Sequence, residues 1–141
     1  MPKWTLNLGG HVANITGYTD SDWGSDQDNR KSIGAYVFRL GDSVISWKTK
    51  KQSSVALSSV EAEYMAMCQA AKESVWLTGL FEDFGINLQS PMVIFSDSQG
   101  AIALANNPAT RNLSTLLFNI ISHVSSSNLT ALPSDIFPPK P

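Results

Sequence analysis

Five acidic residues stand where predicted strands end or a predicted helix begins, and they carry the strongest chemical signal in this sequence. They are Asp20, Asp22, Glu61, Glu63 and Asp97. Hard divalent cations such as Mg²⁺ need oxygen ligands that rigid elements bring together. Acids at the ends of elements meet that need, whereas acids scattered over a solvated surface do not. Taken singly, each acid is better explained as a turn residue, a helix cap or a charge at a helix N-terminus.

Turn and cap residues define the elements that would position these acids. Strands are predicted over residues 12–19, 32–40, 44–50 and 92–96, and Gly41-Asp42 joins the second to the third as a hairpin. Ser58 to Glu61 is a capping box that opens a helix to about Phe84, with a kink or a break expected near Lys72 or Gly79. A second helix is expected to be capped by Asp97 and to end at Ala105. The apolar stripe of the long helix, expected to face the core, consists of Val60, Tyr64, Cys68, Ala71 and Val75.

The order of these elements predicts a mixed α/β sheet. The first three strands form an antiparallel meander, and the first strand lies parallel to the fourth across the long helix. The C-terminal ends of parallel strands form a crevice in which ligands bind. Asp20 and Asp97 lie at those ends, and Glu63 lies in the first turns of the crossover helix. Together these three acids suit a pair of Mg²⁺ ions roughly 3.5–4 Å apart, with Mn²⁺ as a substitute.

Length and composition exclude several other functions. The chain has 141 residues, enough for one domain, and a net charge of −2, so it is not a general polyanion binder. A local basic strip surrounds Trp47 and consists of Arg30, Lys31, Arg39, Lys48, Lys50 and Lys51. It suits a phosphate backbone, and a solvated hairpin edge protected by lysines explains it equally well. No stretch has the length of a signal peptide core or a membrane span, so we expect a protein that is not secreted and has no membrane partner.

Longer motifs between residues 17 and 108 resemble the ribonuclease H domain of Ty1/copia-type retrotransposon Pol polyproteins. They include Gly17 to Trp23, Arg30-Lys31-Ser32, Ile45-Ser46-Trp47-Lys48, Glu61 to Ala66 and Asp97 to Ala105. The resemblance implies a three-layer RNase H-like fold and Mg²⁺-dependent endonucleolytic cleavage of the RNA strand of RNA–DNA hybrids. It also implies the hybrid and the reverse transcriptase domain of the parent polyprotein as partners. The implied location is the cytoplasm, in a virus-like particle, or the nucleus.

The resemblance gives each candidate residue a role. The catalytic residues and metal ligands are Asp20, Glu63 and Asp97. Asp22 and Glu61 become turn and cap residues. Ser21, Ser98 and Gln99 would lie against the nucleic acid, and the basic strip adds Lys48, Lys50 and Lys51 as nucleic-acid contacts.

The family pattern breaks after Pro108. It should continue with Arg-Thr-Lys-His-Ile-Asp-Ile and later supply a fourth aspartate, but the sequence has neither motif. Codons for Asn112 to Ser122 exist that read Pro-Lys-His-Ile-Val-Ile-Gln-Tyr-His-Phe when read two bases later. We therefore divide the chain into a lead-in (1–13), an RNase H-like domain (14–110) and a frameshifted, partly disordered tail (111–141) that lacks the last strand and helix.

Two alternatives to this interpretation stay open. A diverged in-frame end would place Asp135 as the fourth acid. The alternative function is a catalytically inactive retroelement remnant that at most binds nucleic acid.

Overall fold

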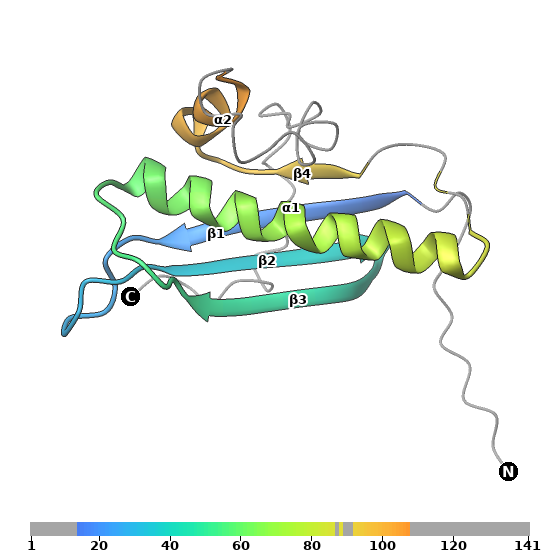
Figure 1. The fold of residues 1–141 in the computed structure, drawn as a ribbon, viewed down its shortest axis with the longest axis horizontal. Coiled ribbons are helices and arrows are strands. Elements are labelled where there is room, and N and C mark those ends of the chain that lie inside the picture. Colours follow the sequence, from blue (N-terminus) through green and yellow to red (C-terminus); the bar gives the residue numbers. More distant parts are fainter. Residues whose placement is uncertain (1–13, 87, 89–91, 108–141) are drawn as a thin grey trace, which may run out of the picture.

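The computed structural model describes residues 14–86, 88 and 92–107. Four strands and two helices form in this part of the chain (Figure 1): β1 (Ile15–Asp22), β2 (Ile33–Leu40), β3 (Ser43–Lys51), α1 (Ser59–Asp83), β4 (Val93–Phe95) and α2 (Gln99–Asn106). The predicted lead-in, the tail from residue 111 and Asp135 lie outside the described residues. The described residues therefore do not test the frameshift hypothesis or the predicted loss of the last strand and helix.

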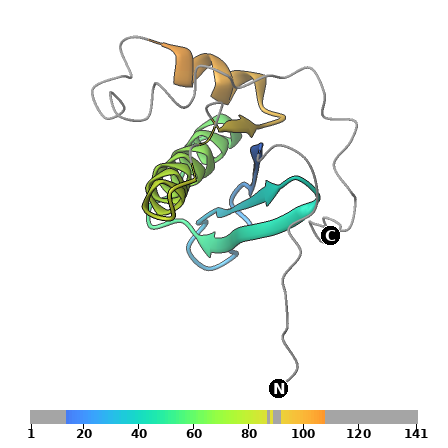
Figure 2. The ribbon, with the colours of Figure 1, turned by 90° about the vertical axis from the view of Figure 1, so that its right-hand side faces the viewer.

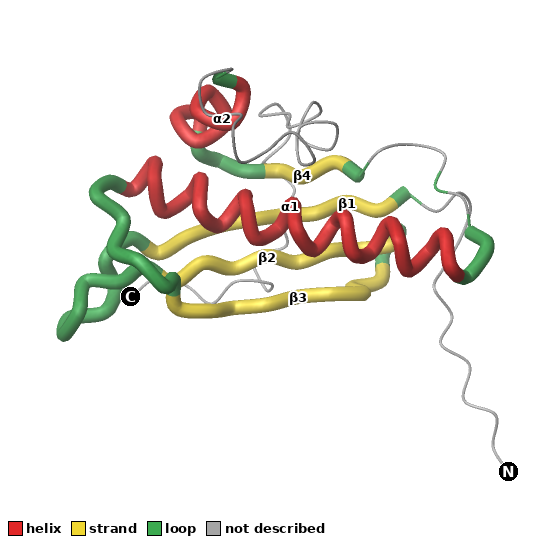
Figure 3. The backbone as a smooth tube through the Cα atoms, in the orientation of Figure 1, coloured by secondary structure: helices red, strands yellow, loops and turns green. Residues whose placement is uncertain are grey.

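The strands form one mixed sheet in the order β3-β2-β1-β4 (Figure 3). β1 is antiparallel to β2, and β2 is antiparallel to β3. β1 is parallel to β4, with Thr16 opposite Val93 and Tyr18 opposite Phe95. The hairpin between β2 and β3 turns at Gly41, whose φ of 57° suits a residue without a side chain. The predicted meander with one parallel strand is confirmed.

Helix α1 begins at the predicted capping box. Ser58 Oγ accepts a hydrogen bond from the Glu61 N–H at 3.1 Å, and Glu61 Oε2 accepts one from the Leu57 N–H at 2.6 Å. The helix then continues for 25 residues as a single element. Of the two expected alternatives, a kink or a break, the break is therefore wrong. Gly85, with a φ of 72°, follows its end. Neither helix of the described part is long and apolar enough to cross a membrane.

Small residues bring α1 against one face of the sheet (Figures 1 and 2). The buried face of the helix consists of Ala62, Glu63, Ala66, Met67, Ala70, Ala71, Ser74 and Leu77. The predicted apolar stripe is wrong in part, because Val60 and Val75 are 37% and 44% exposed. Alanines let a helix backbone approach strands closely, so they take the inner face although the valines are more apolar.

The helices and the sheet share one hydrophobic core. Ala101, Ile102 and Ala105 of α2 pack in the same cluster as Phe38 of β2 and Met67 of α1. Both described helices therefore cover the same face, and the described residues form two layers. A third layer, on the other face of the sheet, has no element among the residues that the structure describes.

Gly17 has less room for a side chain than the other described glycines with a measured clearance, so Gly17→Ala is expected to destabilise the fold. A Cβ at this position would lie 2.6 Å from Cε1 of Phe38, whose side chain is fully buried. We expect a loss of about 1–3 kcal/mol in the free energy of unfolding. The matched control is Gly79→Ala in α1, where a Cβ meets nothing within 4 Å and where alanine should add about 0.5–1 kcal/mol. Urea unfolding measures the free energy of unfolding of both variants. If the two substitutions changed it in the same direction, the prediction would be contradicted.

Candidate active site

Three carboxylates from separate parts of the chain meet at one end of the sheet. One carboxylate oxygen from each of Asp20, Glu63 and Asp97 lies within 4.8 Å of the others. Asp20 is on β1, Glu63 is in the second turn of α1, and Asp97 lies between β4 and α2. The structure thus brings together the three acids that the sequence selects, whereas Glu61 accepts a hydrogen bond from the backbone before the helix.

Ser21 connects the strand to the helix at this point. Its N–H donates to Asp20 Oδ1 at 2.8 Å and to Glu63 Oε1 at 3.2 Å. Ser21 is 6% exposed. Its backbone N–H holds Glu63 of α1 beside Asp20 of β1. Sequence reasoning chose Ser21 as a contact for nucleic acid and did not foresee this bond.

Asp97 lies directly before the start of α2. The predicted cap is wrong, because Ser98 and not Asp97 caps this helix, with Ser98 Oγ accepting a hydrogen bond from the Ala101 N–H at 3.2 Å. Serine and aspartate both suit the N-cap position. Because Ser98 takes it, the Asp97 carboxylate does not cap the helix and stays exposed. Gly100 lets α2 approach α1 closely, because a Cβ there would lie 2.9 Å from Val60 Cγ2.

The electrostatics of Glu63 indicate a missing positive charge. Burial is the largest cause that raises its pKa from 4.5 to about 7, and the charges of Asp20 and Asp97 act in the same direction against the hydrogen bonding of Ser21. Glu63 Oε2 is buried and has no hydrogen-bond partner in the described part of the chain. A buried, unpaired carboxylate oxygen beside two further carboxylates is a donor set for a hard divalent cation. The residues present therefore fit Mg²⁺ or Mn²⁺.

The remaining predicted site residues divide into two groups. Ser98 and Gln99 begin α2 directly after Asp97, and Gln99 is exposed. The lysines lie on β3, at the far edge of the sheet order from β4. Lys51 forms an ion pair with Asp26. The structure does not bring Lys48, Lys50 or Lys51 to the carboxylates.

A hollow between the loop after β1 and the segment before α1 has no counterpart in the sequence-based site. Trp23 Nε1 donates to the Ala56 carbonyl at 3.1 Å and ties the loop after β1 to the segment before α1. A hollow of about 420 Å³ lies here, and its lining includes Arg30 and Leu57. Trp23 is 53% exposed and Leu57 is 87% exposed. The signal was present in the sequence, since Trp23 follows Asp20 by three residues, but nothing in the sequence showed that Leu57 joins it.

Comparisons with known proteins identify related chains. No protein-family model matches. The chain is 43% identical over 102 residues to the retrovirus-related Pol polyprotein from transposon TNT 1-94 of Nicotiana tabacum, covering 72% of this chain and 8% of that protein. It is 39% identical over 99 residues to the Pol polyprotein from transposon RE1 of Arabidopsis thaliana, covering 70% and 7%. The chain is homologous to a segment of the retrovirus-related Pol polyproteins of plant transposons.

Other similarities of this Pol-related chain are shorter or more distant. It is 50% identical over 67 residues to secreted RxLR effector protein 161 of Plasmopara viticola, covering 48% of this chain and 47% of the effector. LC11-RNase H1, solved in complex with an RNA/DNA hybrid, aligns with a TM-score of 0.49 and 14% identity over 78% of this chain and 75% of that one.

The chain spans less than a tenth of the length of the two transposon polyproteins. The predicted resemblance to retrotransposon Pol polyproteins is confirmed, and the described strand order is that of the predicted RNase H-like fold.

Proposed function

We propose that this chain is the ribonuclease H segment of a retrotransposon Pol polyprotein and cleaves the RNA strand of RNA–DNA hybrids endonucleolytically with Mg²⁺. The observation that carries the proposal is the cluster of Asp20, Glu63 and Asp97, whose carboxylate oxygens lie within 4.8 Å of one another. The RNase H-like strand order and the Pol relatives support a hydrolase of this type. The hybrid and the reverse transcriptase domain of the parent polyprotein are the proposed partners.

Each residue of the site has a separate task in this proposal. Asp20, Glu63 and Asp97 hold the cations, and the Ser21 N–H keeps Glu63 turned toward β1. When bound, a pair of divalent cations activates a water and stabilises the leaving oxygen of a phosphodiester. The described residues contain no histidine, so within them no imidazole competes for the role of base. Recognition of the hybrid rests on its A-form shape and 2′-hydroxyls rather than on base sequence.

A cleavage assay with labelled hybrid tests the proposal. We expect internal cuts in the RNA strand with Mg²⁺ or Mn²⁺, none with EDTA, and none in the same RNA as a single strand. Asp97→Asn is the control, because Asp97 is exposed and the change preserves its shape while removing its charge. Equal cutting by Asp97→Asn would mean that the carboxylate cluster does not carry the activity.

The second candidate is a retroelement remnant that binds metal and hybrid without cleaving. The departure from the family pattern after Pro108 favours it, because the fourth acid of the family belongs to that region, outside the described residues. Thermal stabilisation by Mg²⁺ together with hybrid binding, but without cuts, would support this candidate over the first.

A further inference from the structure

An exposed apolar stripe runs along the C-terminal part of α1, at the opposite end of the helix from Glu63. It consists of Trp76, Leu80 and Phe84, and we call it the outer stripe. Residues four apart lie on the same face of a helix, one turn above another. Trp76 is 58% exposed and Phe84 is 70% exposed, whereas Leu77 is buried in the core. Large aromatic side chains exposed in a row indicate a surface that another segment or molecule covers.

The charges at this end of α1 favour a positive neighbour. The last turn of the helix ends with Glu82 and Asp83 and carries no basic residue. The C-terminus of a helix bears a partial negative charge, so cations stabilise it and acids do not. Both acids are exposed, and neither forms an ion pair within the described residues. The occupant of the outer stripe is therefore expected to be apolar, with a positive charge beside its apolar residues.

The first residues of the chain have this composition. Trp4, Leu6 and Leu8 alternate with polar residues, so an extended chain presents all three on one side. Lys3 precedes them, and residues 1–8 contain no acidic residue. These residues lie outside those that the structure describes, so the match rests on their sequence.

The chain enters the domain at the same end as the outer stripe. Asn14, the first described residue, accepts a hydrogen bond from the Gly41 N–H at 3.3 Å. Ile15 shares one core cluster with Leu77 of α1, so β1 starts beside the C-terminal part of the helix (Figure 1). The six residues that follow Leu8 span at most about 20 Å, and the outer stripe extends about 12 Å along the helix axis. Residues 3–8 can therefore reach it without any movement of β1.

The size of the outer stripe favours an occupant from the same chain. The exposed parts of Trp76 and Phe84 leave roughly 250 Å² to cover, on the usual area of a large aromatic side chain. A stable complex of separate molecules buries about 800 Å² on each partner. A tethered segment needs less, because its high effective concentration offsets the entropy that association costs.

We propose that residues 3–8 dock on the outer stripe of α1. Their apolar side chains cover Trp76 and Phe84, and Lys3 lies beside the two acids of the last turn. Docking fixes the path of the chain ahead of β1 and shields the outer stripe from other molecules. The alternative occupant is a second copy of this chain, and the test separates the two.

Disulfide trapping in the full chain tests the contact. Cys68 is replaced by alanine in every variant, and Leu6→Cys is combined with Leu80→Cys, because the central residues of the two segments meet whichever way the segment runs. Under mild oxidation we expect a disulfide within the monomer. Leu6→Cys with Val75→Cys is the matched control, since Val75 is exposed on α1 outside the outer stripe. A disulfide needs two Cα atoms within about 7 Å, so the control pair should stay reduced.

The other outcomes of the trapping experiment overturn the proposal. A disulfide between two chains would assign the outer stripe to a second copy. A Leu6→Cys and Leu80→Cys protein that stays reduced would show that the segment does not dock, and equal trapping of both pairs would show a segment without a fixed position.

Thermal melting gives a second measurement that needs no cysteine. We expect Leu6→Ser and Trp76→Ser each to lower the melting temperature by about 5 °C. The double variant should melt close to the lower of the two, because both substitutions remove the same contact. Val75→Ser is the control and should have a smaller effect. Additive shifts, or a Leu6→Ser protein that melts like the wild type, would overturn the proposal.

Discussion

Glu63→Gln is expected to slow hybrid cleavage about 10³-fold and, at the same time, to stabilise the metal-free protein at pH 8. The rate falls because the substitution removes one of three anionic oxygen donors. Metal ions lower the activation free energy of such reactions by several kcal/mol, and each 1.36 kcal/mol lost slows the reaction tenfold. The stability rises because the buried Glu63 carboxylate has a pKa of about 7, against an ordinary 4.5. Keeping it charged at pH 8 costs at most about 3 kcal/mol, and a neutral amide avoids that cost.

The control is a glutamate-to-glutamine substitution two residues earlier in α1, outside the carboxylate cluster. Glu61→Gln changes a carboxylate that accepts a hydrogen bond from the Leu57 N–H, and glutamine can accept this bond as well. We expect it to alter the free energy of unfolding by less than about 0.5 kcal/mol, as for ordinary surface changes. Cleavage rates and urea unfolding in EDTA measure both variants. A Glu63→Gln protein that is less stable than the wild type at pH 8 would refute the account of Glu63 as a strained charge.

The stabilisation that Mg²⁺ gives to the protein is expected to appear as the pH rises toward 7. Between pH 4.5 and about 7, the folded protein keeps a proton on Glu63 that the unfolded chain has released. The folded state binds more protons in this window, so the free energy of unfolding of the metal-free protein falls with rising pH and levels off above about 7. Mg²⁺ must displace that proton below pH 7, so its affinity should rise up to about tenfold per pH unit and then level off.

Melting temperatures from pH 5.5 to 8.5, with EDTA or with excess Mg²⁺, test this linkage. The difference between the two curves should be small at the acidic end and reach a plateau above about pH 7, since a ligand stabilises in proportion to its affinity for the folded state. Asp97→Asn should reduce the plateau and shift its onset to lower pH, because one of the charges that raise the pKa of Glu63 is gone. A Mg²⁺ effect of equal size at all pH values would place the bound ion away from Glu63.

Local signals in the sequence predicted the sheet and the acids well. The Gly41 turn and the Ser58 cap specify backbone geometry within a few residues. The parallel pairing of β1 with β4 follows from the crossover through α1. The acids at strand ends converge for the same reason. Their roles stay a prediction, whereas their positions are confirmed.

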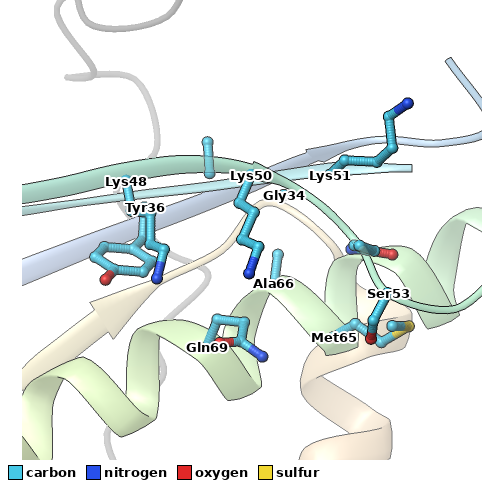
Figure 4. Close-up of a pocket in the computed structure, with 11 residues that line it drawn as sticks. Gly34, Tyr36, Lys48, Lys50, Lys51, Ser53, Met65, Ala66 and Gln69 are labelled. Carbon is cyan, nitrogen blue, oxygen red and sulfur yellow. The ribbon is translucent and has the colours of Figure 1, made fainter. Parts of the chain in front are cut away.

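Other features depend on tertiary contacts that periodicity does not encode. The inner face of α1 carries Ala66 and Ala70, because small side chains let the helix lie close to the sheet. The more apolar Val60 and Val75 are exposed. Ser98 and Asp97 are both good caps, so composition alone could not decide between them. The sequence showed Lys48, Lys50 and Lys51 only as one basic strip, and the structure separates them, because Lys48 and Lys50 point toward α1 (Figure 4) whereas Lys51 pairs with Asp26.

The parallel pairing of β1 with β4 determines when the acid cluster can form during folding. The meander closes short loops between neighbouring strands, but the contact of Thr16 with Val93 encloses β2, β3 and the whole of α1. Contacts between residues so distant along the chain pay the largest loop-closure entropy and form late. Asp20 and Glu63 can meet as α1 docks, whereas Asp97 arrives only with β4. On a ribosome, the acid cluster is therefore complete only after β4 and Asp97 have emerged, and metal binding by a nascent chain is expected to report that the last described strand has joined the sheet.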